Sequence, residues 1–283
     1  MVTPMREDGG LDLDAAQRLA THLVEHGHDG LVVSGTTGES PTTTDAEKAD
    51  LVRAVLEAVG DRARVVAGAG SNDTAHSIEV ARAMEAAGAH ALLAVTPYYS
   101  KPPQEGIVAH FEAIADATGL PVMVYDIPGR AGVEIRTETH VRLAQHPRIQ
   151  AVKDAKGDLF AATEVMRQTD LLWFSGDDVL NLAHLTQGAT GVVSVVGHVA
   201  GDLYAEMVAS VDKGDLTRAV ELHRQVVPVV KAIMTVTQGA IMAKAALREL
   251  GVIDSAAVRL PLVEATPDQV AIVRAGLSES GLH

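Results

Sequence analysis

Short apolar runs rich in β-branched residues recur along the chain, and longer segments with helical periodicity separate them. The runs lie at residues 30–34, 64–67, 91–95, 122–125, 149–153, 171–174 and 191–194. Their length and continuous apolarity are typical of strands that are buried on both faces of a parallel sheet. The segments between them show helical periodicity; examples are 45–59, 74–87, 104–117 and 137–145. Several of them begin with Asp or Thr, which cap helix N-termini. The pattern therefore predicts strands that alternate with helices.

This alternation predicts a (β/α)8 barrel. A doubly wound open sheet gives the same alternation, but it seldom sustains about eight units of about thirty residues, and no Gly-x-Gly-x-x-Gly fingerprint begins this chain. Met1–Pro4 reads as the end of a first strand, either with its beginning missing or unusually short. We expect the barrel to span residues 1–199.

After the last strand the pattern is helical only. The expected helices lie at 200–213, 215–233, 239–250 and 268–277, which exceeds the single helix that closes a barrel. Few Pro or Gly residues separate them from the barrel. We therefore expect residues 200–283 to form the last barrel helix and a C-terminal helical extension packed on the barrel.

Composition narrows the class of protein. Of the 283 residues 47% are hydrophobic but only 3% are aromatic, so Val, Leu, Ile and Ala must fill the core. The net charge of -14 and the lack of a run of Lys and Arg argue against a nucleic-acid partner. The absence of cysteine and of a signal-type start favours the cytoplasm, and no apolar run approaches the ~20 residues that a membrane-spanning helix needs.

Polar residues at the C-terminal ends of barrel strands are the candidates for catalysis, because barrel active sites lie there. Lys153 ends an apolar strand. Burial lowers the pKa of a lysine, and the neutral amine is the form that a Schiff-base nucleophile requires. The alternative is a lysine that pairs with Asp154 or another carboxylate at the barrel mouth.

Two further features fit Schiff-base chemistry. Tyr125 ends the preceding strand and is placed to move the protons that imine formation requires, although a lone tyrosine there is more often a hydrogen-bonded core residue. Gly35-Thr36-Thr37-Gly38 offers hydroxyls and approachable backbone N–H groups for a carboxylate. The alternative is a turn whose threonines cap the next helix.

Five motifs, in this order and spacing, resemble the signatures of the 4-hydroxy-tetrahydrodipicolinate synthase family, also called dihydrodipicolinate synthases. The resemblance covers essentially the whole chain. The wider superfamily, which includes N-acetylneuraminate lyase and 2-keto-3-deoxy-sugar-acid aldolases, shares the lysine and the tyrosine, so these two indicate only pyruvate-type Schiff-base chemistry. The motifs are Gly35–Ser40, Thr96–Tyr99, Tyr125–Arg130, Val152–Ala155 and Ser175–Asp178.

The resemblance implies condensation of pyruvate with L-aspartate 4-semialdehyde, the first committed step of the diaminopimelate route to lysine, without a metal or an organic cofactor. In that scheme Lys153 attacks the keto carbon of pyruvate and Tyr125 moves the protons. Thr37 and the Val193 backbone hold the pyruvate carboxylate. The resemblance also implies that Gly176, in the Ser175–Asp178 motif, is one of the substrate-binding residues.

The resemblance also implies a homotetramer, built as a dimer of tight dimers. Thr36 would link Tyr125 to Tyr99, which reaches in from the neighbouring subunit. Arg130 would hold the carboxylate of the semialdehyde, since a guanidinium binds carboxylates with paired hydrogen bonds.

Some positions depart from the commonest family pattern. Asp126 stands where Asn is usual, and Ala131 where Thr or Ser is usual. At the lysine-feedback site, the resemblance implies that His76 and Lys48 replace the glutamate and histidine of lysine-sensitive members. We expect weak or absent inhibition by L-lysine, because both changes disfavour a cationic effector.

Two other functions stay open at this point. One is a sibling pyruvate-dependent aldolase that acts on a sugar acid, which Arg130 and the Tyr98-Tyr99 pair disfavour. The other is a non-catalytic barrel that serves as a binding protein, which would be expected to lack Lys153 or Tyr125.

Overall fold

The computed structural model describes residues 1–283 and divides into two compact units. The first unit comprises Met1–Val65 and Ser194–His283, and the second comprises Val66–Val193. The chain therefore leaves the first unit within a strand and returns to it near residue 194.

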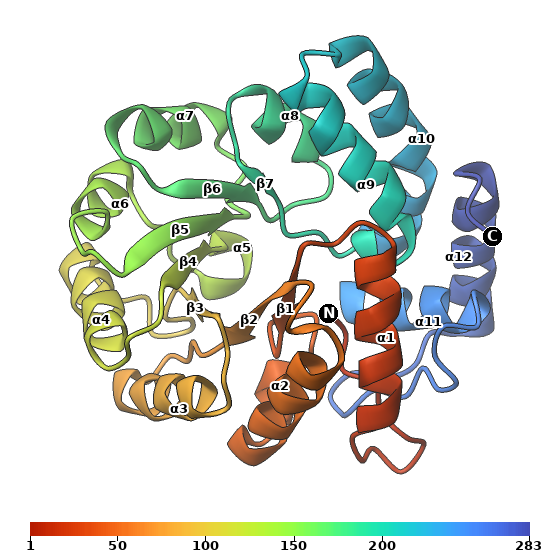
Figure 1. The fold of residues 1–283 in the computed structure, drawn as a ribbon, viewed down its shortest axis with the longest axis horizontal. Helices are drawn as coiled ribbons and strands as arrows, with labels where there is room; N and C mark the ends of the chain where they lie inside the picture. Colours follow the sequence, from red (N-terminus) through yellow and green to blue (C-terminus); the bar gives the residue numbers. More distant parts are fainter. The chain divides into compact units, whose positions relative to one another are not determined.

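Seven strands follow one another in the sheet in chain order, from β1 to β7. In the second unit each strand pairs in parallel with the next. The helices of this unit lie along the outer side of the strands, except for the short α5, which lies on their inner side (Figure 1). The strands that pair there are β2 (Arg64–Gly68), β3 (Ala91–Val95), β4 (Val122–Asp126), β5 (Ile149–Asp154), β6 (Leu172–Ser175) and β7 (Gly191–Val192), and the helices are α3 (Thr74–Ala86), α4 (Gln104–Asp116), α5 (Pro128–Ala131), α6 (Thr137–Leu143), α7 (Leu159–Gln168) and α8 (Asn181–Thr186).

The register of β4 and β5 decides which side chains meet. Tyr125 lies opposite Lys153, and Asp126 lies opposite Asp154. Successive side chains of a strand point to opposite faces of the sheet. Tyr125 and Lys153 therefore share one face, while the two aspartates share the other.

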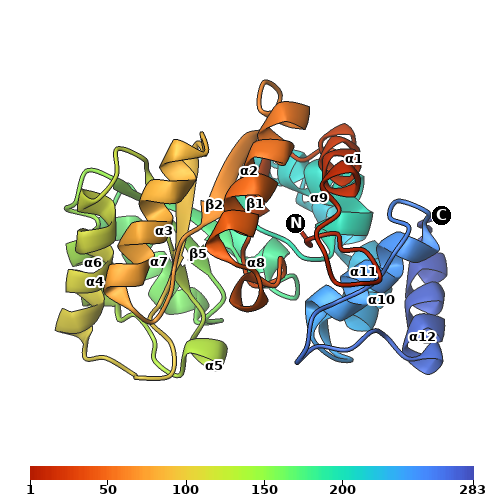
Figure 2. The same ribbon diagram turned by 90° about the horizontal axis from the view of Figure 1, so that it is seen from below.

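The first unit holds the N-terminal elements and the C-terminal helices. Helix α1 packs on α2, and α10 packs on α9 and α12. Figure 2 shows α10, α11 and α12 side by side. The elements of this unit are α1 (Leu13–Glu25), β1 (Gly30–Val33), the 3-10 turn η1 (Ser40–Thr42), α2 (Asp45–Val59), α9 (Gly197–Asp212), α10 (Leu216–Met234), α11 (Gly239–Glu249) and α12 (Pro267–Glu279).

Side-chain caps explain where several helices begin. Thr44 and Glu47 form a capping box at α2, and Thr266 and Gln269 form another at α12. Asp caps accept from backbone N–H groups at the start of four more helices; they are Asp12, Asp73, Asp158 and Asp215. The strands and helices expected from the periodicity are confirmed, with ends that shift by up to three residues.

The expectation of a first strand at Met1–Pro4 is wrong in one respect, because these residues are assigned to no strand. The segment is nevertheless buried and fixed within the first unit. The α-amino group of Met1 donates to the Val32 carbonyl of β1 (2.6 Å), and the Val2 N–H donates to His198 Nε2 (2.9 Å). Side-chain and terminal groups thus replace the backbone ladder that a strand needs.

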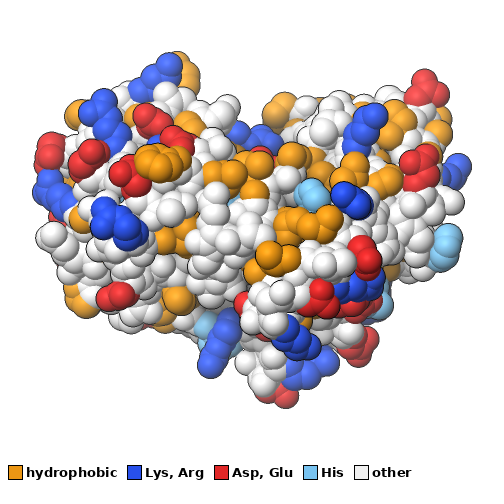
Figure 3. Space-filling view, turned by 90° about the horizontal axis from the view of Figure 1, so that it is seen from above, with side chains coloured by type: hydrophobic (Ala, Val, Ile, Leu, Met, Phe, Trp, Pro, Cys, Tyr) orange, Lys and Arg blue, Asp and Glu red, His pale blue; other side chains and the backbone are white.

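Charged side chains of both signs are interspersed on the surface. On the face shown in Figure 3, Lys and Arg are scattered among acidic and apolar groups. No single helix is long and apolar enough to cross a membrane, and α10 with α11 meets the length and composition limits only as a pair bent by 115°.

Candidate functional site

The predicted nucleophile lies at the end of β5, against the predicted proton shuttle at the end of β4. Lys153 Nζ is 4.3 Å from the centre of the Tyr125 ring. Lys153 is 8% exposed and Tyr125 is 4% exposed. The apolar residues that precede both side chains on their strands form the buried sheet, so the two polar groups reach the strand ends in a largely dry environment.

Burial lowers the pKa of Lys153 from 10.5 to about 8. Removal of water is the largest cause, because it disfavours the charged ammonium. The positive charge of Arg130 lowers the pKa further, while the negative charge of Asp178 opposes the shift. The amine is therefore neutral in a substantial fraction of molecules near neutral pH.

This pKa predicts how imine formation depends on pH. A lysine of pKa 8 is neutral in about one molecule in ten at pH 7, against fewer than about one in a thousand for an ordinary lysine. Because only the neutral amine attacks a carbonyl, the initial rate of adduct formation with pyruvate should rise about tenfold per pH unit and level off above about pH 8. The measurement is borohydride trapping at short times across the pH range, read by intact mass.

Two substitutions test the assignment of this titration with opposite signs. Arg130→Gln removes a positive charge and should move the inflection to higher pH, whereas Asp178→Asn should move it to lower pH. An inflection that stays in place in both variants would show that another group controls the rate.

The alternative of a Lys153–Asp154 ion pair is not what the structure shows. Asp154 accepts from the Lys156 N–H (2.8 Å) and faces His184 Nε2 at 4.0 Å. Adjacent residues of a strand point to opposite faces of the sheet, so the Asp154 side chain lies on the face opposite to that of Lys153. The carboxylate whose charge acts on Lys153 is that of Asp178, not that of Asp154.

Gly176 leaves the space that the Lys153 side chain occupies. A Cβ at Gly176 would lie 2.9 Å from both Cγ and Cε of Lys153. The Gly176 N–H donates to the Asp154 carbonyl (2.7 Å), which fixes the backbone at this close approach. The contact indicates that the absence of a side chain at Gly176 sets the position of the Lys153 side chain. The sequence did not predict this role.

Asp126 ties the segment after α5 to the end of β4. Both carboxylate oxygens lie 3.3 Å from the Ile135 N–H, and Oδ2 is 3.6 Å from His140 Nε2.

Arg130 is exposed within α5 and forms no ion pair. The guanidinium is therefore available for a carboxylate ligand.

Tyr99 has an unusual backbone and an unusual exposure. Its φ is +72°, in the left-handed region that a bulky residue rarely adopts, and its side chain is 88% exposed. The Tyr99 N–H donates to the Ala131 carbonyl (3.2 Å), and the Ser100 N–H donates to the Tyr98 carbonyl (2.8 Å). Strain of this kind is concentrated at functional sites, so Tyr99 is a candidate contact residue.

Thr36 and Thr37 lie in the first unit, in the loop after β1. Three N–H groups close the loop on itself: those of Gly38 and Ser40 donate to the Gly35 carbonyl, and that of Glu39 donates to the Thr36 carbonyl. The threonines do not cap a helix, because Thr44 caps α2 and the 3-10 turn has no side-chain cap. The alternative of a capping turn is therefore wrong.

Val193 follows β7, and its N–H donates to the Ser175 carbonyl (2.7 Å). That bond extends the β6–β7 pairing by one residue. The N–H is therefore engaged within the second unit, and the Val193 backbone offers its carbonyl oxygen, which is an acceptor.

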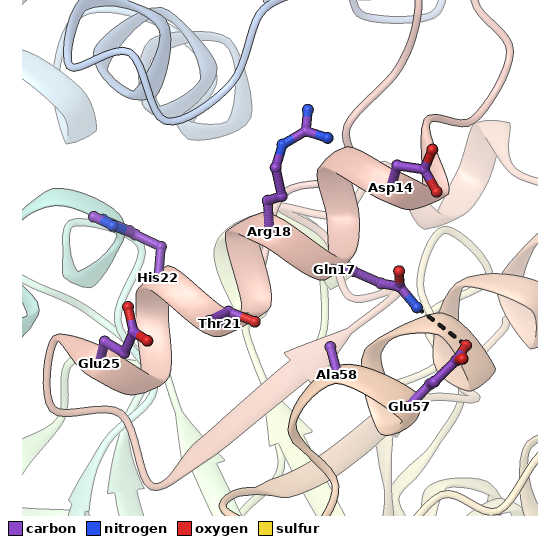
Figure 4. Close-up of a pocket in the computed structure, with 8 residues that line it drawn as sticks. All are labelled: Asp14, Gln17, Arg18, Thr21, His22, Glu25, Glu57 and Ala58. Carbon is purple, nitrogen blue, oxygen red and sulfur yellow. Dashed lines mark hydrogen bonds between the residues drawn. The ribbon is translucent and has the colours of Figure 1, made fainter.

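A hollow on the first unit lies elsewhere, between α1 and α2, and measures about 690 Å³. Figure 4 shows its side chains pointing in different directions, with Gln17 Nε2 bonded to Glu57 Oε2 (3.1 Å). None of the predicted site residues lines it; the lining residues are Asp14, Gln17, Arg18, Thr21, His22, Glu25, Glu57 and Ala58.

Comparison with known proteins adds independent information. A family model described as the dihydrodipicolinate synthetase family matches residues 1–280. The 4-hydroxy-tetrahydrodipicolinate synthase of Kineococcus radiotolerans is 61% identical over 282 residues, covering 100% of this chain and 92% of the relative. The 4-hydroxy-tetrahydrodipicolinate synthase 2 of Streptomyces coelicolor is 58% identical, covering 100% and 94%.

Solved structures agree over the whole chain. The dihydrodipicolinate synthase of Cyanidioschyzon merolae, with lysine bound, has a TM-score of 0.97 at 42% identity and covers 100% of this chain and 97% of its own. The Acinetobacter baumannii enzyme, complexed with pyruvate, has a TM-score of 0.96 at 34% identity with the same coverage. These likenesses confirm the predicted (β/α)8-barrel fold with a C-terminal helical part. The chain belongs to the dihydrodipicolinate synthetase family.

Proposed function

We propose that this enzyme condenses pyruvate with L-aspartate 4-semialdehyde to 4-hydroxy-tetrahydrodipicolinate through a Schiff base on Lys153. The observation that carries the proposal is the buried lysine of pKa about 8 against Tyr125, in a chain whose relatives are named as this synthase. The reaction is a step of the diaminopimelate route to lysine.

The chemistry divides between these two residues. The neutral amine of Lys153 adds to the keto carbon of pyruvate, and the carbinolamine loses water to give the imine. Loss of a proton from the methyl group gives the enamine, whose carbon attacks the aldehyde of the semialdehyde. Each of these steps moves a proton, and we assign that work to the Tyr125 hydroxyl.

Binding of the two carboxylates is assigned to separate groups. For pyruvate we propose the Thr37 hydroxyl, because the Val193 N–H donates to the Ser175 carbonyl and the Val193 carbonyl, an acceptor, cannot donate to a carboxylate. For the semialdehyde we propose Arg130, which is exposed and forms no ion pair. Thr36 is proposed to pass protons between Tyr125 and Tyr99, and Gly176 to give Lys153 its room.

The oligomeric part of the proposal is a homotetramer, a dimer of dimers in which Tyr99 serves the partner's site. The strained backbone and 88% exposure of Tyr99 support a role in contact with another molecule. Sedimentation velocity of the wild type gives the assembly. Mixing Tyr99→Phe with an inactive Lys153 variant tests the sharing, since mixed dimers should regain activity at one site.

The cytoplasmic location stays a prediction from the absence of cysteine.

The function is tested by two measurements on one preparation. Intact mass after borohydride reduction with pyruvate should show one pyruvyl adduct per chain, and a coupled assay should show turnover of aspartate semialdehyde. An adduct with turnover only of a sugar-acid aldehyde would favour the sibling aldolase. A chain that forms no adduct would favour the non-catalytic barrel and overturn the proposal.

We also predict weak or absent inhibition by L-lysine. Lys48 is 7% exposed and its ammonium is 2.9 Å from Asp45 Oδ1, so a second cation gains no carboxylate at that position. Loss of a charged partner costs a ligand about 2–5 kcal/mol, so half-inhibition should require at least about tenfold more lysine than in the variant Lys48→His/His76→Glu. Initial rates over a lysine titration of both proteins give the comparison. Equal inhibition of the two proteins at low lysine would contradict the prediction.

A further inference from the structure

A buried ion pair within the first unit joins the threonine loop to the C-terminal helices. Lys244 of α11 is fully buried and donates from Nζ to Glu39 Oε1 (2.6 Å). Glu39 ends the Gly35–Glu39 loop and is 2% exposed. The two residues are 205 positions apart in the chain.

Every oxygen of the Glu39 carboxylate has a partner from the C-terminal part of the chain. Oε1 accepts from Lys244, and Oε2 accepts from the backbone N–H of Arg259 (2.9 Å). Lys244 donates a second hydrogen bond to the Ala257 carbonyl (2.6 Å). These hydrogen bonds therefore fix the positions of both the Glu39 carboxylate and the Lys244 ammonium.

Arg259 fastens the same segment to the elements around the loop. Its guanidinium donates to the carbonyls of Gly9 (2.9 Å) and Thr42 (2.7 Å), and Nη1 lies 2.8 Å from Glu47 Oε2 of α2. Glu47 in turn belongs to the capping box of α2. The segment after α11 thus holds the C-terminal end of the threonine loop and the elements that follow it.

The loop needs such support because its backbone is strained at both ends. Ser34 has φ +58° and Glu39 has φ +57°, both in the left-handed region that disfavours residues with a Cβ. Conformations of this kind persist only where the surroundings impose them, and they are concentrated at ligand clamps. Thr36 and Thr37 lie between these two residues, so their direction depends on how both ends are held.

Stability alone does not explain a buried charged pair. Taking a lysine and a glutamate out of water costs several kcal/mol per ion, and well-packed apolar residues of the same volume are often as stable or more stable. Burial lowers the pKa of Lys244, and the hydrogen bond to Glu39 opposes this effect. The pair therefore contributes to geometry, because its hydrogen bonds fix the position of Glu39 more tightly than apolar packing would.

We propose that Lys244 is a positioning residue that, through Glu39, sets the pose of Thr37 and so the affinity of the enzyme for the carboxylate of its 2-oxo acid substrate. The inference rests on the proposed function, in which Thr37 binds that carboxylate. The C-terminal helices thereby control substrate affinity without touching the substrate.

The deciding variant is the double substitution Glu39→Gln/Lys244→Met. It removes both charges at nearly constant volume, so neither ion is left unpaired in the interior. The Gln amide oxygen can still accept from the Arg259 N–H. A folded protein without the Lys244 bond is the expected result, with a melting temperature close to that of the wild type.

The measurement is the concentration of 2-oxo compound that gives half-maximal borohydride-trapped adduct. For pyruvate we expect it to rise at least tenfold in the double variant. For pyruvamide, which has the same keto group and no carboxylate, we expect less than a twofold change. The kcat at saturating pyruvate should stay within about threefold of the wild type, so the loss appears in KM.

A matched control is Arg274→Gln, which breaks the exposed Arg274–Glu249 pair between α12 and α11. It should leave both half-saturation values unchanged. Wild-type affinity for pyruvate in the folded double variant, or equal losses for pyruvate and pyruvamide, would overturn the inference. If the double variant does not fold, Glu39→Met/Lys244→Met, which also leaves no buried charge, decides in the same assay. Failure of the wild type to form any adduct would instead refute the proposed function.

Discussion

Replacement of Lys153 by arginine is expected to abolish the pyruvyl adduct and to lower kcat/KM by at least about 10³-fold, or about 4 kcal/mol. A guanidinium stays protonated in proteins and offers no lone pair to a carbonyl. The variant keeps the positive charge at the end of β5, so the loss isolates nucleophilicity from electrostatics. Intact mass after borohydride reduction and the coupled assay measure the two effects.

Two further variants keep this test interpretable. Arginine places a permanent charge in a site that is 8% exposed and can destabilise the protein, so Lys153→Met gives an uncharged side chain of similar length. Lys156→Arg is the matched control, because Lys156 lies three residues further on and pairs with Glu134 (3.2 Å). A folded Lys153→Met protein that still forms the adduct would assign the imine to another lysine.

Replacement of Tyr125 by phenylalanine is expected to lower kcat by about 10²- to 10⁴-fold, the usual contribution of a positioned acid or base. The ring that packs against Lys153 is retained, so the change removes the hydroxyl and little else. The adduct with pyruvate should still form, but slowly, because the amine is present and the protons must pass through water. Time-resolved trapping separates this slow formation from the absence of adduct expected for Lys153→Met.

Tyr204→Phe is the control for loss of a buried phenol hydroxyl. Tyr204 is 4% exposed, as Tyr125 is, but lies on α9 in the first unit and in none of the five motifs. Near-wild-type kcat is expected for it. Unchanged kcat in Tyr125→Phe would remove Tyr125 from the mechanism and leave proton transfer to water or to another hydroxyl.

The sequence predicted the part of this site that depends on local periodicity. Alternation along a strand places Lys153 and Tyr125 at strand ends on one face, and the register of β4 and β5 confirms it. The Asp and Thr caps marked several helix starts for the same local reason. The strand expected at Met1–Pro4 failed because its composition suits a strand, while its partners in the fold are one carbonyl of β1, reached by the terminal amine, and a histidine ring.

The residues that set the position and the pKa of Lys153 were not evident from the sequence, because their effect depends on close packing between segments that are distant along the chain. Gly176 meets the Lys153 side chain at 2.9 Å, and Asp178 acts on its pKa through space. A motif that contains both was recognised, but no spacing rule gives a distance between side chains on different elements. Asp154 shows the converse, since adjacency in sequence suggested a partner that strand alternation turns away.

The sequence by itself thus determined the order of strands and helices, the residue types available for imine chemistry and the family to which the chain belongs. These depend on patterns within a few turns or strands and on motifs. The tertiary structure alone decided the lowered pKa of Lys153, the room that Gly176 leaves, and the bond between Lys244 and Glu39 across 205 positions. Burial and hydrogen-bond geometry are properties of the packed chain, because water is excluded only where segments remote in sequence come together.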